Sequence, residues 1–287
     1  MRRSPVQAEL SRLDPERDCQ RIIYLDACFE FPFDTTRALE LALFRTFAVP
    51  SIAKRLDSTG EFPLRAQTRY DDTDLLISSF CEAGYDSELG RRAIRRMNQI
   101  HGRFEIANDD FLYVLSTFVF EPFRWNARFG WRLLTEIEKE GTFCFWREVG
   151  RRMAIRDVPE TLADFERFNV EFERERFSYS EEGRRIADAT MSMFVAWFPG
   201  LPRRLGRRGI QAVLDDHLLD ALGYPRPARA LRATAYATLK ARGRASRLVG
   251  ERRRPRIRTT MRHRSYRDGY VIEELGPPPV SSAREAP

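Results

Sequence analysis

The chain has 287 residues, of which 43% are apolar and 12% aromatic, and it carries a formal net charge of +7. A chain of this length and apolar content can bury a substantial core, which excludes a disordered protein. Its longest apolar run, "FLYVLSTFVF" at 111–120, spans about half of a bilayer crossing, so we expect no membrane-spanning segment. The absence of a secretory signal pattern and four dispersed cysteines are typical of a reduced, cytoplasmic protein.

The positive charge is concentrated at the C-terminal end. Residues 223–287 hold sixteen Arg and Lys against five Asp and Glu, whereas residues 1–222 carry a net charge of −4. Such a tail could contact an anionic membrane surface peripherally, although a solvated helix followed by a disordered end has the same composition. It lacks a groove-reading or base-stacking motif, which argues against nucleic acid as a partner.

Helical patterns follow one another along the first half of the chain. Residues 69–83 predict a helix that ends before Gly84, and Asp86 and Ser87 are capping candidates for a second helix at about 88–105. An apolar helix over about 109–121 should be stopped by Pro122. We expect further helices over the segments 126–140, which ends at Gly141, and 142–153.

The second half of the chain continues in the same way. Asp157 and Glu160 have the spacing of a capping box and predict another helix start, followed by a stripe of Phe165, Phe168 and Phe172. Later helices are predicted at about 203–222 and 227–248, and the pattern is lost beyond residue 250. The sequence therefore predicts an all-α fold, a single multi-helix bundle, with an N-terminal extension at 1–19, a helical domain at 20–250 and a basic, disordered tail at 251–287.

Motif searches exclude several kinds of site. The chain has three histidines, and none follows a Glu by three residues as in a di-iron bundle. It also lacks HExxH, CxxCH, a phosphate-binding GxxxxGK[ST] loop and a dinucleotide-binding GxGxxG. A site that needs one imidazole, such as a non-covalent haem with one protein ligand, remains compatible with this composition.

His101 is the histidine best situated for such a site. In a helix it shares an apolar face with Ile94, Met97 and Phe104. A hydrogen-bonded core histidine would fit the same pattern, so the residues alone leave both interpretations open. His217 stands beside two carboxylates and is expected to be solvated or capping, and His263 belongs to the basic tail.

Arg69 and Thr73 form a second candidate group. Their spacing of four places them on one helix face, and the short connection around Gly84 makes this helix a neighbour of the one that carries His101. Both side chains could then reach the interior near His101. The alternative is an exposed Arg69 that pairs with Asp71 or Asp72.

Four segments together resemble one known family: "RYDDT" (69–73), "RRMNQIHGRF" (95–104), "ANDDFLYVLSTFVFEPFRW" (107–125) and "FWREVGRRMAIRDVP" (145–159). They are similar to the MpaB family of oxygenases, which shares a domain with the bacterial latex-clearing proteins, and the similarity covers about 20–225. The resemblance implies a helical fold with a globin-like core, a haem b, and O2-dependent cleavage of carbon–carbon double bonds in isoprenoid chains.

The resemblance also assigns roles to residues. His101 matches the axial histidine of the haem iron, and Arg69 and Thr73 match an arginine and a threonine near the haem. A second histidine of the family motif is Asn98 here, and a lysine before the threonine is Asp72. The expected function is thus a haem-dependent oxygenase that acts with O2 on a small apolar substrate. The alternative is a non-catalytic helical protein that binds a lipid or a partner, with the basic tail as its contact surface.

Overall fold

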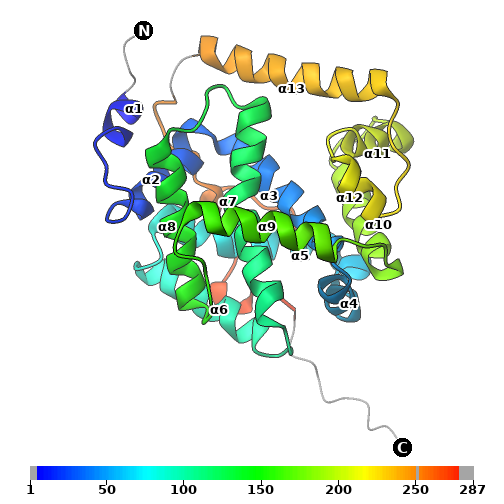
Figure 1. Ribbon diagram of the computed structural model, residues 1–287, viewed down its shortest axis with the longest axis horizontal. Coiled ribbons are helices and arrows are strands. Elements are labelled where there is room, and N and C mark those ends of the chain that lie inside the picture. The colour runs from blue at the N-terminus through cyan, green and yellow to red at the C-terminus, as the bar shows by residue number, and fades with distance from the viewer. Residues whose placement is uncertain (1–4, 250–251, 278–287) are drawn as a thin grey trace, which may run out of the picture.

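The computed structural model describes residues 5–249 and 252–277, and within these ranges it contains helices and no strand (Figure 1). The predicted all-α fold is confirmed. The α-helices are α1 (Pro5–Leu10), α2 (Cys19–Leu25), α3 (Pro32–Phe47), α4 (Pro50–Ser58), α5 (Glu61–Ala83), α6 (Glu88–His101), α7 (Asn108–Phe129), α8 (Glu136–Arg152), α9 (Leu162–Arg176), α10 (Glu181–Ala196), α11 (Arg203–Gln211), α12 (Asp216–Ala221) and α13 (Arg229–Val249). Three shorter turns are the π-helical η1 (Asp26–Glu30) and the 3-10 helices η2 (Arg258–Thr260) and η3 (Ile272–Glu274).

Two large apolar clusters form most of the core. The first is built mainly from α5, α6, α7 and α8, and includes Phe80, Phe120 and Phe145. The second is built mainly from α3, α4, α9, α10 and α12. Because α5 and α7 contribute buried side chains to both clusters, they join the two halves of the molecule.

A buried ionic network connects helices that belong to different parts of the chain. Arg45 of α3 is 5% exposed, and its guanidinium contacts Glu121 of α7 at 2.7 Å, Glu173 of α9 at 3.0 Å and Asp215 at 2.6 Å. Asp215 is in turn the N-cap of α12. Each carboxylate therefore compensates the buried cation while it fixes one helix relative to α3.

Several predicted helix ends are wrong, and each has a physical reason. Pro122 does not stop α7, because Trp125 and Phe129 beyond it are buried against Ala38 of α3. Gly141 lies inside α8, where a Cβ atom would come within 2.6 Å of the Ile22 side chain, so this glycine permits close packing of α2 on α8.

Further boundaries differ from the prediction, among them the end of α6, which is His101 rather than about residue 105, so that Phe104 lies outside the helix. The predicted helix over 126–140 is interrupted, because Thr135 and Glu138 form a capping box that starts α8. Asp157 has a positive φ of 59°, and the cap of α9 is Thr161, whose side chain accepts from the Asp164 N–H. The predicted helix at 203–222 is two helices, because Asp215 caps α12.

Residues 252–277, which we call the C-terminal strap, pack along α5 and α6. Ile272 and Leu275 are 3% and 0% exposed and belong to the first core cluster. In Figure 1 the end of the strap, drawn in red, lies beside α6. The expectation of an unpacked tail is therefore wrong for residues 252–277, because Ile272 and Leu275, together with the partly buried Tyr266 and Tyr270, anchor this arginine-rich segment on the core. Residues 1–4, 250–251 and 278–287, which fall within the predicted extension, domain and tail, lie outside the described residues.

Candidate functional site

The candidate site is built on α5 and α6, which lie side by side and are joined by the turn 84–87. Gly84 ends α5 with a φ of 85°, and the Ser87 side chain caps α6 by accepting from the Gly90 N–H at 2.9 Å. A Cβ atom on Gly90 would lie 2.1 Å from the Gly84 carbonyl oxygen. The glycine thus lets α6 start close to the end of α5. The predicted ends at Gly84 and Ser87 are confirmed.

His101 is the last residue of α6 and is half-buried. Its ring meets Phe111 of α7 edge to face, with 5.3 Å between the ring centroids. Its Nδ1 atom is buried and has no hydrogen-bond partner among the described residues. Burial, together with the positive charge of Arg69, lowers the pKa of His101 to about 4. The imidazole is therefore neutral near pH 7 and keeps a lone pair that a metal can use.

Arg69 and Thr73, both on α5, are joined by hydrogen bonds. The Arg69 Nη1 donates to Thr73 Oγ1, which itself donates to the Arg69 carbonyl at 3.0 Å, and the guanidinium lies 5.7 Å from the Phe62 ring. Burial lowers the pKa of Arg69, opposed by the charges of Asp72 and Glu61. An arginine in a protein nevertheless remains charged. Its charge acts on His101, and the two residues lie on the neighbouring helices α5 and α6.

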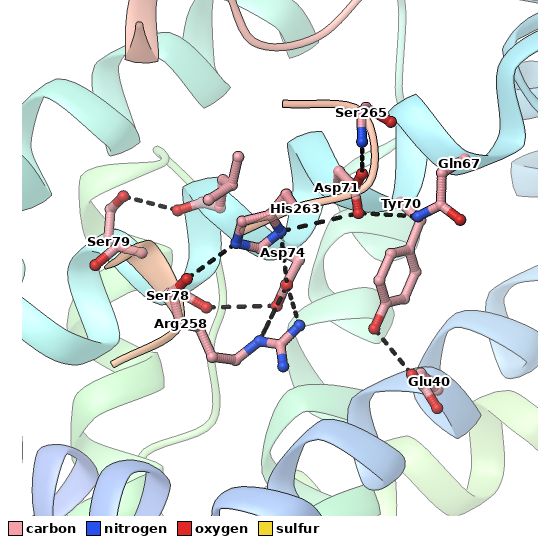
Figure 2. Close-up of polar contacts among 12 residues, drawn as sticks. Glu40, Gln67, Tyr70, Asp71, Asp74, Ser78, Ser79, Arg258, His263 and Ser265 are labelled. Atoms are coloured by element: carbon pink, nitrogen blue, oxygen red, sulfur yellow. Dashed lines mark hydrogen bonds and ion pairs between the residues drawn. The ribbon is translucent and has the colours of Figure 1, made fainter. Parts of the chain in front are cut away.

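The carboxylates proposed as alternative partners of Arg69 are bound to the C-terminal strap, as Figure 2 shows for Asp71. Asp71 accepts from the Ser265 N–H at 2.8 Å and from Gln67 at 3.0 Å, and Asp72 accepts from the Tyr266 hydroxyl. Among the described residues, Arg69 forms no ion pair with either of them. The guanidinium thus retains donors for an anion from outside the chain.

His263 lies within this strap contact and is 7% exposed, unlike the solvated tail residue that its sequence context suggests. Its Nε2 donates to the Arg258 carbonyl at 2.9 Å, and its Nδ1 lies 3.9 Å from Asp71 and 3.7 Å from Asp74. Burial disfavours the charged ring, but Asp71, the Arg258 carbonyl and Asp74 together outweigh it and raise the pKa of His263. Figure 2 shows Arg258 and His263 converging on Asp74 from the strap.

The two positions that depart from the family motif also have defined contacts. Asn98 donates to the Arg152 carbonyl at 2.9 Å and so ties α6 to α8. Asp72 is 1% exposed, and burial raises its pKa although the Tyr266 hydroxyl and Arg69 oppose this. Both residues therefore act on the framework around the site.

A small cavity lies elsewhere in the same core. It has a volume of about 60 Å³ and is lined mainly by apolar side chains, among them Phe31, which lies between η1 and α3, Leu39 of α3, Phe118 and Phe123 of α7, and Trp146 of α8. His101, Arg69 and Thr73 do not line it. No group of three or more His, Cys, Asp or Glu side chains within 5–249 and 252–277 could hold a metal ion.

The residues missed by sequence reasoning are those of the strap. Tyr266, Arg258 and His263 stand in a stretch that reads as an irregular basic tail, and their partners lie in α5. The one available signal was the apolar pair Ile272 and Leu275 within "GYVIEEL". None of the helices in the part of the chain that the structure describes is long and apolar enough to cross a membrane.

Comparison with known proteins identifies the family to which the chain belongs. Residues 41–247 match the family model described as "ER-bound oxygenase mpaB/B'/Rubber oxygenase, catalytic domain". The ER-bound oxygenase mpaB of Penicillium roqueforti (strain FM164) is 27% identical over 238 residues, which cover 77% of this chain and 80% of that protein. The ER-bound oxygenase mpaB' of Penicillium brevicompactum is 26% identical over 219 residues, covering 70% of this chain and 52% of that protein. Since the family match extends over more than half of the chain and includes α5, α6 and the residues of the candidate site, this protein belongs to the mpaB and rubber oxygenase family.

Proposed function

We propose that this protein is a haem b-dependent oxygenase that uses O2 to cleave a carbon–carbon double bond in an isoprenoid-like or other long apolar substrate. Family membership supports the oxygenase class. The observation that carries the haem assignment is His101, a neutral imidazole with a buried, unpartnered Nδ1 beside an unpaired guanidinium in the described chain. The residues present therefore fit a haem, whose iron takes one imidazole and whose propionates need cations.

In this proposal His101, Arg69 and Thr73 have different tasks. His101 would bind the haem iron, and Arg69 would pair with a propionate or orient a ligand beside the haem, with Thr73 holding the guanidinium through Nη1. Bound haem would supply the O2 chemistry. The rings of Phe62 and Phe111, which contact Arg69 and His101, would give both groups an apolar surrounding on one side.

We also propose a cytoplasmic location with contact at a membrane surface. The relatives described as ER-bound support the membrane contact. The basic segment 223–287 and the surface described in the next subsection are two regions that could provide it.

The test is the visible absorption spectrum of the purified protein after expression with ample haem precursor. A Soret band is expected, and His101→Ala should lose it while the helical circular dichroism is retained. His217→Ala is the matched control, because His217 is exposed and lies against Phe177 rather than in the candidate site. Full haem content in His101→Ala would overturn the assignment, and colourless wild-type protein would favour the non-catalytic alternative.

A further inference from the structure

The corner between α10 and α11 exposes large apolar side chains. Phe198, Leu201 and Leu205 are 58%, 38% and 53% exposed, and all three lie within one segment of eight residues. Pro199, Pro202 and Gly200, whose φ is 99°, turn the chain sharply between the two helices. The turn therefore leaves three large apolar side chains on the surface, although side chains of this kind are usually buried.

The same corner exposes arginines that have no acidic partner. Arg203 and Arg204 form no ion pair or hydrogen bond among the described residues, and Arg208 contacts only the Gln211 side chain, at 3.4 Å. The sequence between Asp188 and Asp215 contains no Asp or Glu. The surface is therefore both apolar and positively charged, and the chain itself does not neutralise it.

Packing against α10 determines which side of α11 stays free. A Cβ atom on Gly206 would lie 3.0 Å from the Val195 side chain, and Arg207 pairs with Asp188 of α10. These two residues hold α11 against α10. Leu205 and Arg208 remain exposed, and Figure 1 shows α11 at the edge of the molecule.

The residue before this corner also contacts α5 and the strap. Trp197, which precedes Phe198, donates to Gln67 of α5 at 2.6 Å. Arg264 of the strap is exposed and lies 5.4 Å from the Trp197 ring, which adds another cation beside the apolar side chains.

We propose that the α10–α11 corner, residues 198–208, docks onto the surface of an anionic phospholipid bilayer. Phe198, Leu201 and Leu205 enter the boundary between headgroups and acyl chains, and Arg203, Arg204 and Arg208 pair with lipid phosphates. Exposed apolar side chains interleaved with unpaired cations are the features by which interfacial helices bind such membranes.

Charge complementarity favours a membrane over the other occupants. Two copies of this chain that met through the same corner would bring these arginines together with no carboxylate to compensate them. A nucleic acid would use the arginines but leave Phe198, Leu201 and Leu205 without an apolar partner.

The test is flotation of the full-length protein with vesicles of phosphatidylcholine alone or with about one third phosphatidylserine. We expect binding to the anionic vesicles that weakens with salt. Phe198→Ser combined with Leu205→Ser should reduce the partition coefficient at least tenfold, because two apolar anchors are lost. Arg203→Gln combined with Arg204→Gln should reduce it about fivefold for each arginine.

Matched controls come from exposed residues elsewhere. Leu133→Ser removes an apolar side chain that is 68% exposed, and Arg12→Gln combined with Arg95→Gln removes two exposed arginines. Both should bind as the wild type does, and circular dichroism should show that all variants fold. No flotation, or flotation that both corner variants retain, would overturn the proposal. Dimerisation abolished by Phe198→Ser and Leu205→Ser, without vesicle binding, would instead assign the corner to a second copy. Because vesicle binding needs no cofactor, these outcomes are independent of the proposed oxygenase chemistry.

Discussion

Arg69 is charged and His101 is neutral, although the two residues lie on neighbouring helices. The guanidinium carries a charge that the described chain does not neutralise directly, and the same charge helps to keep the nearby imidazole neutral. Tyr266 contributes to this arrangement, because its hydroxyl donates to Asp72, whose charge acts on Arg69. A strap residue thereby leaves Arg69 available to an anionic ligand.

Replacing Arg69 by lysine should weaken haem retention although the charge is kept. A lysine ammonium cannot copy the planar fork that donates to Thr73 and, in the proposed function, to a haem propionate as well. The measurement is haem stoichiometry from the Soret absorbance during competition with apomyoglobin. Arg65→Lys, on the same helix but exposed and paired with Glu61, is the control and should behave as the wild type does. Equal haem retention in both variants would contradict the role of Arg69.

Replacing Thr73 by valine should have a smaller effect. The side chain keeps its shape, but Arg69 Nη1 loses its acceptor, which should lower the free energy of unfolding by about 1 kcal/mol. Denaturant unfolding of the haem-free protein measures this difference. A loss of haem as large as that in Arg69→Lys would mean that Thr73 contacts the ligand itself.

The residues of the candidate site could be named from the sequence through family resemblance, whereas most of their partners could not. The spacing of Arg69 and Thr73 is local and predicts that they share one helix face, on which the structure shows a hydrogen bond between them. The partner of Asp72 is 194 residues away in the chain, and nothing in the local pattern of "RYDDT" indicates it. Long-range pairs of this kind follow from packing, which a single sequence does not reveal.

At the scale of helices, sequence signals correctly predicted the helix ends that are determined by the capping residues themselves. Gly84 and Ser87 act through their own backbone and side chain, so their prediction was correct. Pro122 failed as a stop signal because two aromatic residues beyond it gain burial by continuing the helix, and this outweighs one missing hydrogen bond. The strap was missed because its few apolar residues act only together with α5 and α6.

The strap should hold α5 more weakly as the pH rises. The folded-state pKa of His263 is raised above its ordinary value of 6.5, so its contribution to stability is fully present below about pH 6.5 and is lost as the pH rises through the raised pKa. The facing groups are Asp71 and Asp74 of α5, with Arg258 of the strap already paired to Asp74.

The measurement is the free energy of unfolding of the wild type and of His263→Gln at pH 6 and pH 8.5. Glutamine keeps an N–H donor for the Arg258 carbonyl but cannot carry the charge. The wild type should exceed the variant by more at pH 6 than at pH 8.5. A difference that is the same at both pH values would show that His263 does not titrate in the strap contact.

For the molecule as a whole, the ionic network around Arg45 should be essential to stability. Arg45→Met removes the cation that faces Glu121, Glu173 and Asp215, and breaking a buried pair from one side costs about 3–5 kcal/mol. Thermal and denaturant unfolding measure the loss. Arg174→Met, at an exposed arginine of α9, is the control and should change stability by less than about 0.5 kcal/mol. A similar small change in Arg45→Met would show that the helices hold together without the network.

The strap has a consequence for when the partners of α5 become available during synthesis. A ribosome makes α5 long before it makes Tyr266, which lies 194 residues after Asp72. The acidic side of α5 therefore lacks these partners until the strap has been made. Asp71 and Asp72 gain them only after the helices α6 to α13 have been synthesised, so a late segment of the chain completes the surroundings of one of the earlier helices.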